Sequence, residues 1–198
     1  MIKKLFNPFT YIAGERSLIA GIAVILATGV IGFFSHMHFP NILSVKTSPD
    51  FPLQYYLMQN IVNWLVISTI LYLISILFSK SSVRIVDVFG TQGLARFPYL
   101  ISAFIGFSAS LEKFGEYVLW ELLNQGEPVE LSTLAMVIAI FLITLTLLLT
   151  IWLIILSYNA FKVSSNIKGP KSVWLFILGL LLSIFITEFI TNQMIQIL

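Results

Sequence analysis

Residues 131–161 read LSTLAMVIAIFLITLTLLLTIWLIILSYNAF, an uncharged run between Glu130 and Lys162. A helix needs about 20 mainly apolar residues to cross the roughly 30 Å hydrocarbon core of a bilayer. This run is long enough to cross it with residues to spare. It therefore predicts a transmembrane helix, and the rest of the chain can be compared with it.

Four other uncharged runs flank this one along the chain. Those at 17–45 and 51–79 pass the same length test, whereas those at 97–111 and 172–187 pass only if each helix continues beyond its first acidic residue. Helices that continue in this way place the acids near the far interface. The sequence thus predicts five spans, at about 17–38, 57–79, 97–121, 131–157 and 172–195.

The composition agrees with a chain whose solvent is lipid. Of 198 residues, 58% are hydrophobic and only 10% are charged, against about 25% charged in an ordinary soluble domain. Backbone N–H and C=O groups inside a bilayer must hydrogen-bond to one another, which favours helices. The sequence lacks the repeated segments of alternating hydrophobicity that would predict a β-barrel. We expect an all-α integral membrane protein, a compact five-helix bundle in a single domain over residues 1–198.

Lysine and arginine are distributed unevenly around the predicted spans. The positive-inside rule places the richer side in the cytoplasm, so the N-terminus is expected inside and the C-terminus outside, in a bacterial inner (cytoplasmic) membrane. The poorer side carries only Lys46 and Lys113. The richer side carries nine such residues: Lys3, Lys4, Arg16, Lys80, Arg84, Arg96, Lys162, Lys168 and Lys171.

Small residues recur on one face of several predicted spans. Such residues let membrane helices approach closely, and this interpretation is favoured over a lined pore. The positions expected at helix contacts are Gly21, Thr28, Gly32, Gly106, Ala135, Ala139 and Gly179.

The chemistry-bearing residues do not form a catalytic pattern. Cysteine is absent, and His36 and His38 point about 200° apart on a helix, so an interfacial role is favoured over a metal site. No histidine lies in the middle of any span to act as a base for Ser108 or Ser110, which makes an intramembrane hydrolase the weakest interpretation. We expect no enzyme activity and no cofactor, and the net charge of +2 suggests no nucleic-acid partner.

Three carboxylates leave two interpretations open. Glu112, Glu116 and Glu188 follow apolar runs. They are either the wet ends of amphipathic helices, which is favoured, or ion sites in a small transporter.

Residues 87–100 read DVFGTQGLARFPYL and interrupt the apolar pattern. Pro98 suits the first turn of a helix, and basic residues near a membrane surface are attracted to anionic headgroups. We expect a cytoplasmic segment that lies on the membrane surface with Val86 and Phe89 inserted. Its candidate docking residues are Arg84, Asp87, Gly90, Gln92, Gly93, Arg96 and Pro98.

The same stretch resembles the second-loop segment of small prokaryotic members of the Yip family, the Ypt/Rab-interacting membrane proteins. SYNAFKVS at 157–164, NIKG at 166–169 and Asn7-Pro8-Phe9 are also similar to that family. The resemblance implies five spans and a cytoplasmic N-terminus. Eukaryotic relatives act in vesicle traffic and bind small GTPases through a long cytoplasmic region, whereas only about sixteen residues precede the first span here.

These features together favour a non-enzymatic membrane-organising, adaptor or scaffold protein. The alternative is a small transporter or permease component. The expected partners are membrane lipids, with anionic headgroups among them, and another membrane protein or a second copy of the chain.

Overall fold

Long uncharged runs of the sequence form long helices in the structure, a computed structural model that describes residues 5–47 and 51–197 (backbone only at 122, 123 and 195–197). Four of these helices are long and apolar enough to cross a membrane, which confirms the all-α class and four of the predicted apolar helices. They are α2 (Glu15–Phe34), α3 (Leu53–Phe78), α7 (Thr133–Ser165) and α8 (Pro170–Ile197).

The predicted span at 97–121 is wrong in its bounds. The region forms three helices, α4 (Ile85–Ala95), α5 (Phe97–Ile105) and α6 (Ala109–Leu123). The path from Ile85 to Ile105 is bent by 78° from Ala109–Glu121, and counting this bent pair as one span gives up to five. The helical path begins at Ile85, twelve residues before the predicted start at 97, because residues 85–95 form α4 and not a loop.

Proline and glycine set the two breaks in this region. Pro98 lies in the first turn of α5 and has no N–H to continue the hydrogen bonds of α4, so the chain is interrupted locally at Arg96 (φ −80°, ψ 0°). Gly106 ends α5, and a Cβ there would lie 2.7 Å from the Ser35 carbonyl oxygen. The close approach to the end of α2 explains why glycine stands at this bend.

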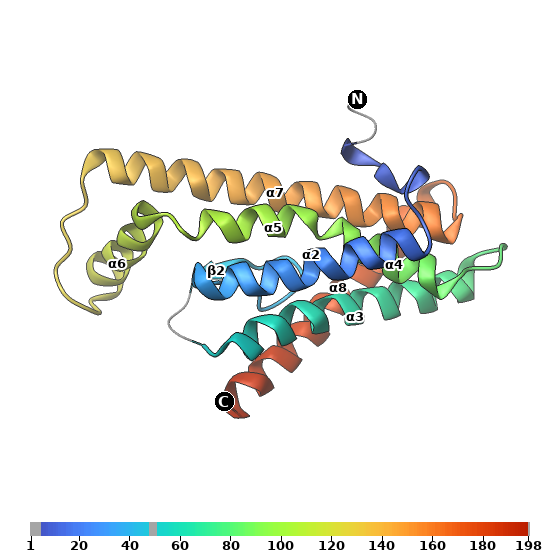
Figure 1. The fold of residues 1–198 in the computed structure, drawn as a ribbon, viewed down its shortest axis with the longest axis horizontal. Helices are drawn as coiled ribbons and strands as arrows, with labels where there is room; N and C mark the ends of the chain where they lie inside the picture. The colour runs from blue at the N-terminus through green and yellow to red at the C-terminus, as the bar shows by residue number, and fades with distance from the viewer. Residues whose placement is uncertain (1–4, 48–50, 198) are drawn as a thin grey trace.

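The helices run back and forth along one long axis (Figure 1). α2 packs against α3, α4 and α5, α3 packs against α8, and α7 packs against α4, α5 and α6. The path of α4 and α5 is antiparallel to α3 and α7, and α6 turns away at the far end of the bundle (Figure 1). The connections between the long helices therefore gather at the two ends of the bundle.

The connection between α2 and α3 folds back against the helices. It contains two short antiparallel strands, β1 (Met37–His38) and β2 (Lys46–Thr47), and the side chains of Phe39 and Ile42 between them are fully buried. A further short element, η1 (Pro8–Thr10), precedes α2 and packs against α7. The α2–α3 connection and η1 both add contacts to the bundle.

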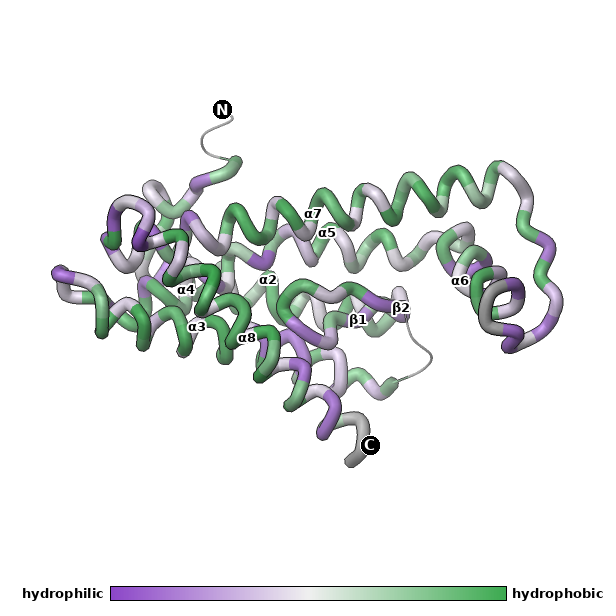
Figure 2. Tube along the Cα trace, turned by 180° about the vertical axis from the view of Figure 1, so that it is seen from behind, coloured by the Kyte–Doolittle hydropathy of each residue, from purple (hydrophilic) through white to green (hydrophobic). Residues whose placement is uncertain are grey.

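Apolar residues fill the helix shafts, and polar residues gather at the bundle ends and around β1 and β2 (Figure 2). Many large apolar side chains nevertheless face outward, such as Phe141 (64% exposed), Leu134 (70%) and Phe185 (74%). Soluble monomers rarely expose apolar patches on this scale. The surface is compatible with a membrane protein.

Most of the small residues expected at helix contacts lie where there is little room for a larger side chain. A Cβ on Gly179 would lie 2.8 Å from a methyl group of Leu71. Thr28 and Ala139 are buried, whereas Ala135 is half-buried. A Cβ on Gly32 would lie 2.5 Å from the Met37 carbonyl oxygen, so the connection between α2 and α3 lies close to α2 here.

Candidate functional site

The site is built on α4 and α5, the helices formed by the segment that interrupts the apolar pattern. α4 lies against α2 through glycines on both helices. A Cβ on Gly21 would lie 2.9 Å from the carbonyl carbon of Gly93 and from the amide nitrogen of Leu94. A Cβ on Gly90 would meet Ser17 in the same way. Gly90 and Gly93 therefore lie at a backbone-to-backbone helix contact.

Buried polar side chains join α4 to α7. The Ser157 hydroxyl donates to the Gln92 side-chain oxygen at 2.6 Å, and the Gln92 amide donates to the Ser157 carbonyl oxygen at 3.0 Å. Gln92 and Ser157 are both 2% exposed. The reciprocal pair satisfies the Gln92 amide oxygen and one of its N–H groups, which a buried polar group requires.

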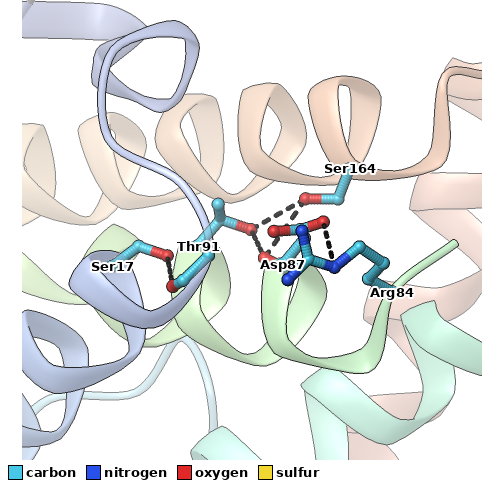
Figure 3. A network of polar contacts seen from close by, with 6 residues as sticks. Ser17, Arg84, Asp87, Thr91 and Ser164 are labelled. Atoms are coloured by element: carbon cyan, nitrogen blue, oxygen red, sulfur yellow. Dashed lines mark hydrogen bonds and ion pairs between the residues drawn. The ribbon is translucent and has the colours of Figure 1, made fainter.

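A second polar contact between these helices involves Thr91 and Asp87 of α4 and Ser164 of α7 (Figure 3). The hydroxyls of Thr91 and Ser164 are 2.9 Å apart, and the Asp87 carbonyl oxygen lies 2.6 Å from the first and 3.3 Å from the second. The Asp87 carboxylate faces Arg84, with 3.8 Å between Oδ2 and Nε. Arg84 is largely exposed, so this ion pair contributes little stability.

Arg96 occupies the joint between α4 and α5 and is only 3% exposed. It lies about 16 Å along a helical path of roughly 30 Å that begins at Ile85, close to the middle. Its Nη2 atom is buried without a hydrogen-bond partner, and none of the described carboxylates forms an ion pair with it. A buried charge without an opposite charge is rare and marks a candidate functional residue.

An aromatic stack links Arg96 to the connection between α2 and α3. The Arg96 guanidinium carbon lies 5.5 Å from the centre of the Tyr99 ring, a distance suited to a cation–π contact. The Tyr99 ring stacks on Phe39 with centroids 4.7 Å apart. Phe39 is held by α3, because its N–H donates to the Gln59 side chain and its carbonyl oxygen accepts from Asn63.

His38 lies beside this stack in the connection between α2 and α3. It is 5% exposed, and its Nδ1 is 3.3 Å from the Gln59 side-chain nitrogen. Burial lowers the pKa of His38 to about 4, and Lys46 also lowers it, while the hydrogen bond with Gln59 acts in the opposite direction. The imidazole is therefore neutral at physiological pH, and its position is interior where the sequence suggested an interface.

The expectation of a membrane-surface docking segment is corrected by this geometry. The side chains or backbones of Gly90, Gln92, Gly93, Arg96 and Pro98 are buried between helices. Phe89 does not project into lipid as expected, because its ring packs edge-to-face on Trp64 and its carbonyl oxygen accepts from the Trp64 indole. Of the predicted docking side chains, Arg84 and Asp87 remain accessible, at 69% and 26%.

The three candidate ion-site carboxylates do not converge. Glu112 and Glu116 are exposed on α6, which packs against α7. The Glu188 carboxylate on α8 instead accepts a hydrogen bond from the side chain of Asn41, in the connection between α2 and α3. No group of three His, Cys, Asp or Glu side chains suited to a metal occurs among the described residues.

Sequence reasoning missed the amides of α3 as interior residues. Gln59, Asn60 and Asn63 are all at most 1% exposed. The sequence contained a usable signal, because the three amides of Q-N-x-x-N at 59–63 share one helical face within an apolar span. Amides on one face of a membrane helix predict a polar partner inside the bundle.

Comparison of the chain with protein-family models, with curated proteins and with solved structures finds no match.

Proposed function

We propose that the chain is an integral membrane protein that crosses the bilayer five times, with its N-terminus in the cytoplasm and its C-terminus outside. We assign the third crossing to the path from Ile85 to Ile105, the first part of the bent pair that ends at Glu121. α6 then lies outside the spans, at the outer end. A bacterial inner membrane is the proposed location.

The distribution of cations supports this orientation. Lys46 and Lys113 lie at the outer end, and Arg96 now belongs to a span instead of a loop. Lys3 and Lys4 lie outside the described residues. The remaining cations lie at the opposite end, at the start of α2, between α3 and α4, and around the connection between α7 and α8: Arg16, Lys80, Arg84, Lys162, Lys168 and Lys171.

We also propose that the protein acts as a non-enzymatic membrane-organising or adaptor protein. The observation that carries this proposal is that several of its buried polar side chains form hydrogen bonds between different helices and connections. Gln92 pairs with Ser157, and the α3 amides hold Phe39. Groups engaged in this way build a rigid scaffold.

The resemblance of residues 87–99 and 157–169 to the Yip family supports the same proposal. A membrane-embedded scaffold with a cationic cytoplasmic end would bind a membrane-protein partner or a second copy of itself. A photo-crosslinking residue at the exposed position Ser82 tests this in native membranes, with exposed Glu127 at the other end as the matched control. One reproducible protein adduct from position 82 alone is expected, and adducts with lipid alone would contradict the proposal.

A small transporter is the second candidate, and Arg96 is the observation that favours it. A cation buried midway along a crossing helix could bind the anionic group of a solute. Anion flux in proteoliposomes tests it, with Arg96→Met to remove the charge and Arg96→Lys to keep it. Flux that Arg96→Met abolishes and Arg96→Lys retains would replace the adaptor proposal.

A further inference from the structure

A cavity of about 360 Å³ opens at the end of the bundle where the α3–α4 and α7–α8 connections meet. Three lysines contribute to its wall, Lys80 from the first connection, Lys168 from the second and Lys171 from the first turn of α8. Segments almost 90 residues apart in sequence thus bring three positive charges to one hollow.

No acidic side chain lines this cavity, and none of the three lysines forms an ion pair with a described carboxylate. Three cations that share a wall repel one another unless an anion lies between them. Ser79, Ser81 and Asn166 add neutral polar groups to the same wall. The lining is suited to a phosphate group, which accepts hydrogen bonds from ammonium and hydroxyl donors.

Hydrogen bonds hold the walls of the cavity together. The Asn166 amide donates to the Ser81 hydroxyl at 3.0 Å across the two connections. The Ser81 N–H donates to the Ser79 hydroxyl at 3.0 Å. Lys171 is positioned over the Phe78 ring, with 4.9 Å between its Nζ and the ring centre. A wall ordered before the ligand arrives loses less entropy on binding.

The surface beside the cavity is apolar and faces outward. α3 and α8 pack side by side, and near the cavity they expose Leu77 (75%) and Trp174 (71%). An exposed tryptophan at the end of a membrane helix is typical of the headgroup level. If a phospholipid phosphate lies in the cavity, the acyl chains of that lipid can contact this apolar surface. A free phosphate ion has no acyl chains and would make no use of it.

We propose that this cavity binds the phosphate headgroup of an anionic phospholipid, with the acyl chains along the outer faces of α3 and α8. Basic pockets between membrane helices on the cytoplasmic side are suited to such headgroups. The proposal rests on the membrane orientation proposed above. It assigns a lipid site to the α3–α4 and α7–α8 connections, away from α4 and α5.

Binding of acyl-labelled phosphatidylglycerol to the full-length protein in a neutral detergent tests the proposal, with acyl-labelled phosphatidylcholine as the zwitterionic comparison. Wild type should bind phosphatidylglycerol at least about tenfold more tightly. The triple variant Lys80→Gln, Lys168→Gln, Lys171→Gln should lose this preference. The control triple variant Lys46→Gln, Lys113→Gln, Lys162→Gln has the same change in net charge outside the cavity and should keep it.

A single substitution keeps the test decisive if the triple variant does not fold. Ser81→Asp can still accept from Asn166 but places a negative charge in the cavity wall, and it should weaken phosphatidylglycerol binding with little effect on phosphatidylcholine. The proposal would be overturned if the control triple variant lost the preference for phosphatidylglycerol as completely as the cavity triple variant does. It would also be overturned if Ser81→Asp kept the preference of the wild type. Full displacement of the lipid by millimolar inorganic phosphate would show a free-anion site and overturn the lipid assignment.

The membrane orientation can fail separately from the lipid site. If residues 81 and 168 are both labelled from the cytoplasm but lipid binding shows no preference, only the lipid site is wrong. If both are labelled from outside, the proposed orientation is wrong, whatever the binding assay reports.

Discussion

The contact between α2 and α4 makes Gly21→Ala a sensitive test of the fold. The added Cβ would lie 2.9 Å from two backbone atoms of α4, whereas ordinary contact begins at 3.4 Å. The two helices would have to separate by about 0.5 Å, the difference between these distances. Backbone atoms cannot rotate away as a side chain can, so the steric cost should be about 1–3 kcal/mol.

Gly115→Ala on α6 is the matched control, because a Cβ there has no neighbour within 4 Å. Both changes replace a helical glycine and gain roughly 0.5–1 kcal/mol of backbone entropy. Their difference therefore isolates the steric term. In thermal unfolding of the purified protein in detergent, Gly21→Ala should melt several degrees below Gly115→Ala, at about 2–4 °C per kcal/mol. A Gly21→Ala variant that melts at or above the control would refute the close α2–α4 contact.

Three further predictions concern buried side chains. Gln92→Leu and Ser157→Ala should show a coupling free energy of about 0.6–1.7 kcal/mol in a double-mutant cycle, and strictly additive effects would contradict the pair. Phe39→Ala should lower the free energy of unfolding by about 3–5 kcal/mol. Phe185→Ala, at a side chain that is 74% exposed, should have a much smaller effect; equal effects would place Phe39 outside the core. The pKa of His38 is lowered from 6.5 to about 4, so stability should be highest above pH 6.5 and fall by about 2–3 kcal/mol as the pH decreases towards 4. A His38→Gln variant should have a flatter pH dependence over that interval, and an unchanged dependence would assign it to another group.

The uncharged runs predicted the long helices because their length and composition are local properties of the sequence. Residues 133–161 of this run lie within α7, which extends to Ser165 with Lys162 in its last turn. A charged side chain is compatible with the last turn of a helix when that turn is exposed to water. Lys162 therefore marks the end of the apolar run but not the end of α7.

The segment at 87–100 could not be predicted correctly from its own residues. Its glycines and polar side chains suggested a connector, but Gly90 and Gly93 face a small-residue surface on α2 and Gln92 faces Ser157 on α7. Those partners come from distant parts of the chain. Tertiary contacts therefore stabilise a helix that local propensity opposed.

The connection between α2 and α3 illustrates the same limit. An interfacial role was expected for His38 next to the first span, and no interior role was expected for the amides of α3. Only the three-dimensional arrangement shows that the chain after α2 folds back and places Phe39 on Tyr99, where Gln59 and Asn63 hold its backbone.

The central claim is that α4 and α5 together form a membrane crossing, and one labelling experiment tests it directly. The chain contains no cysteine, so Ser81→Cys and Glu127→Cys each introduce a single reactive site, before and after this path. With a membrane-impermeant thiol reagent in oriented membranes, the account predicts that residue 81 is labelled from the cytoplasmic side and residue 127 from the opposite side. Labelling of both residues from the same side would show that the path from Ile85 to Ile105 does not cross, and would contradict the five-span arrangement.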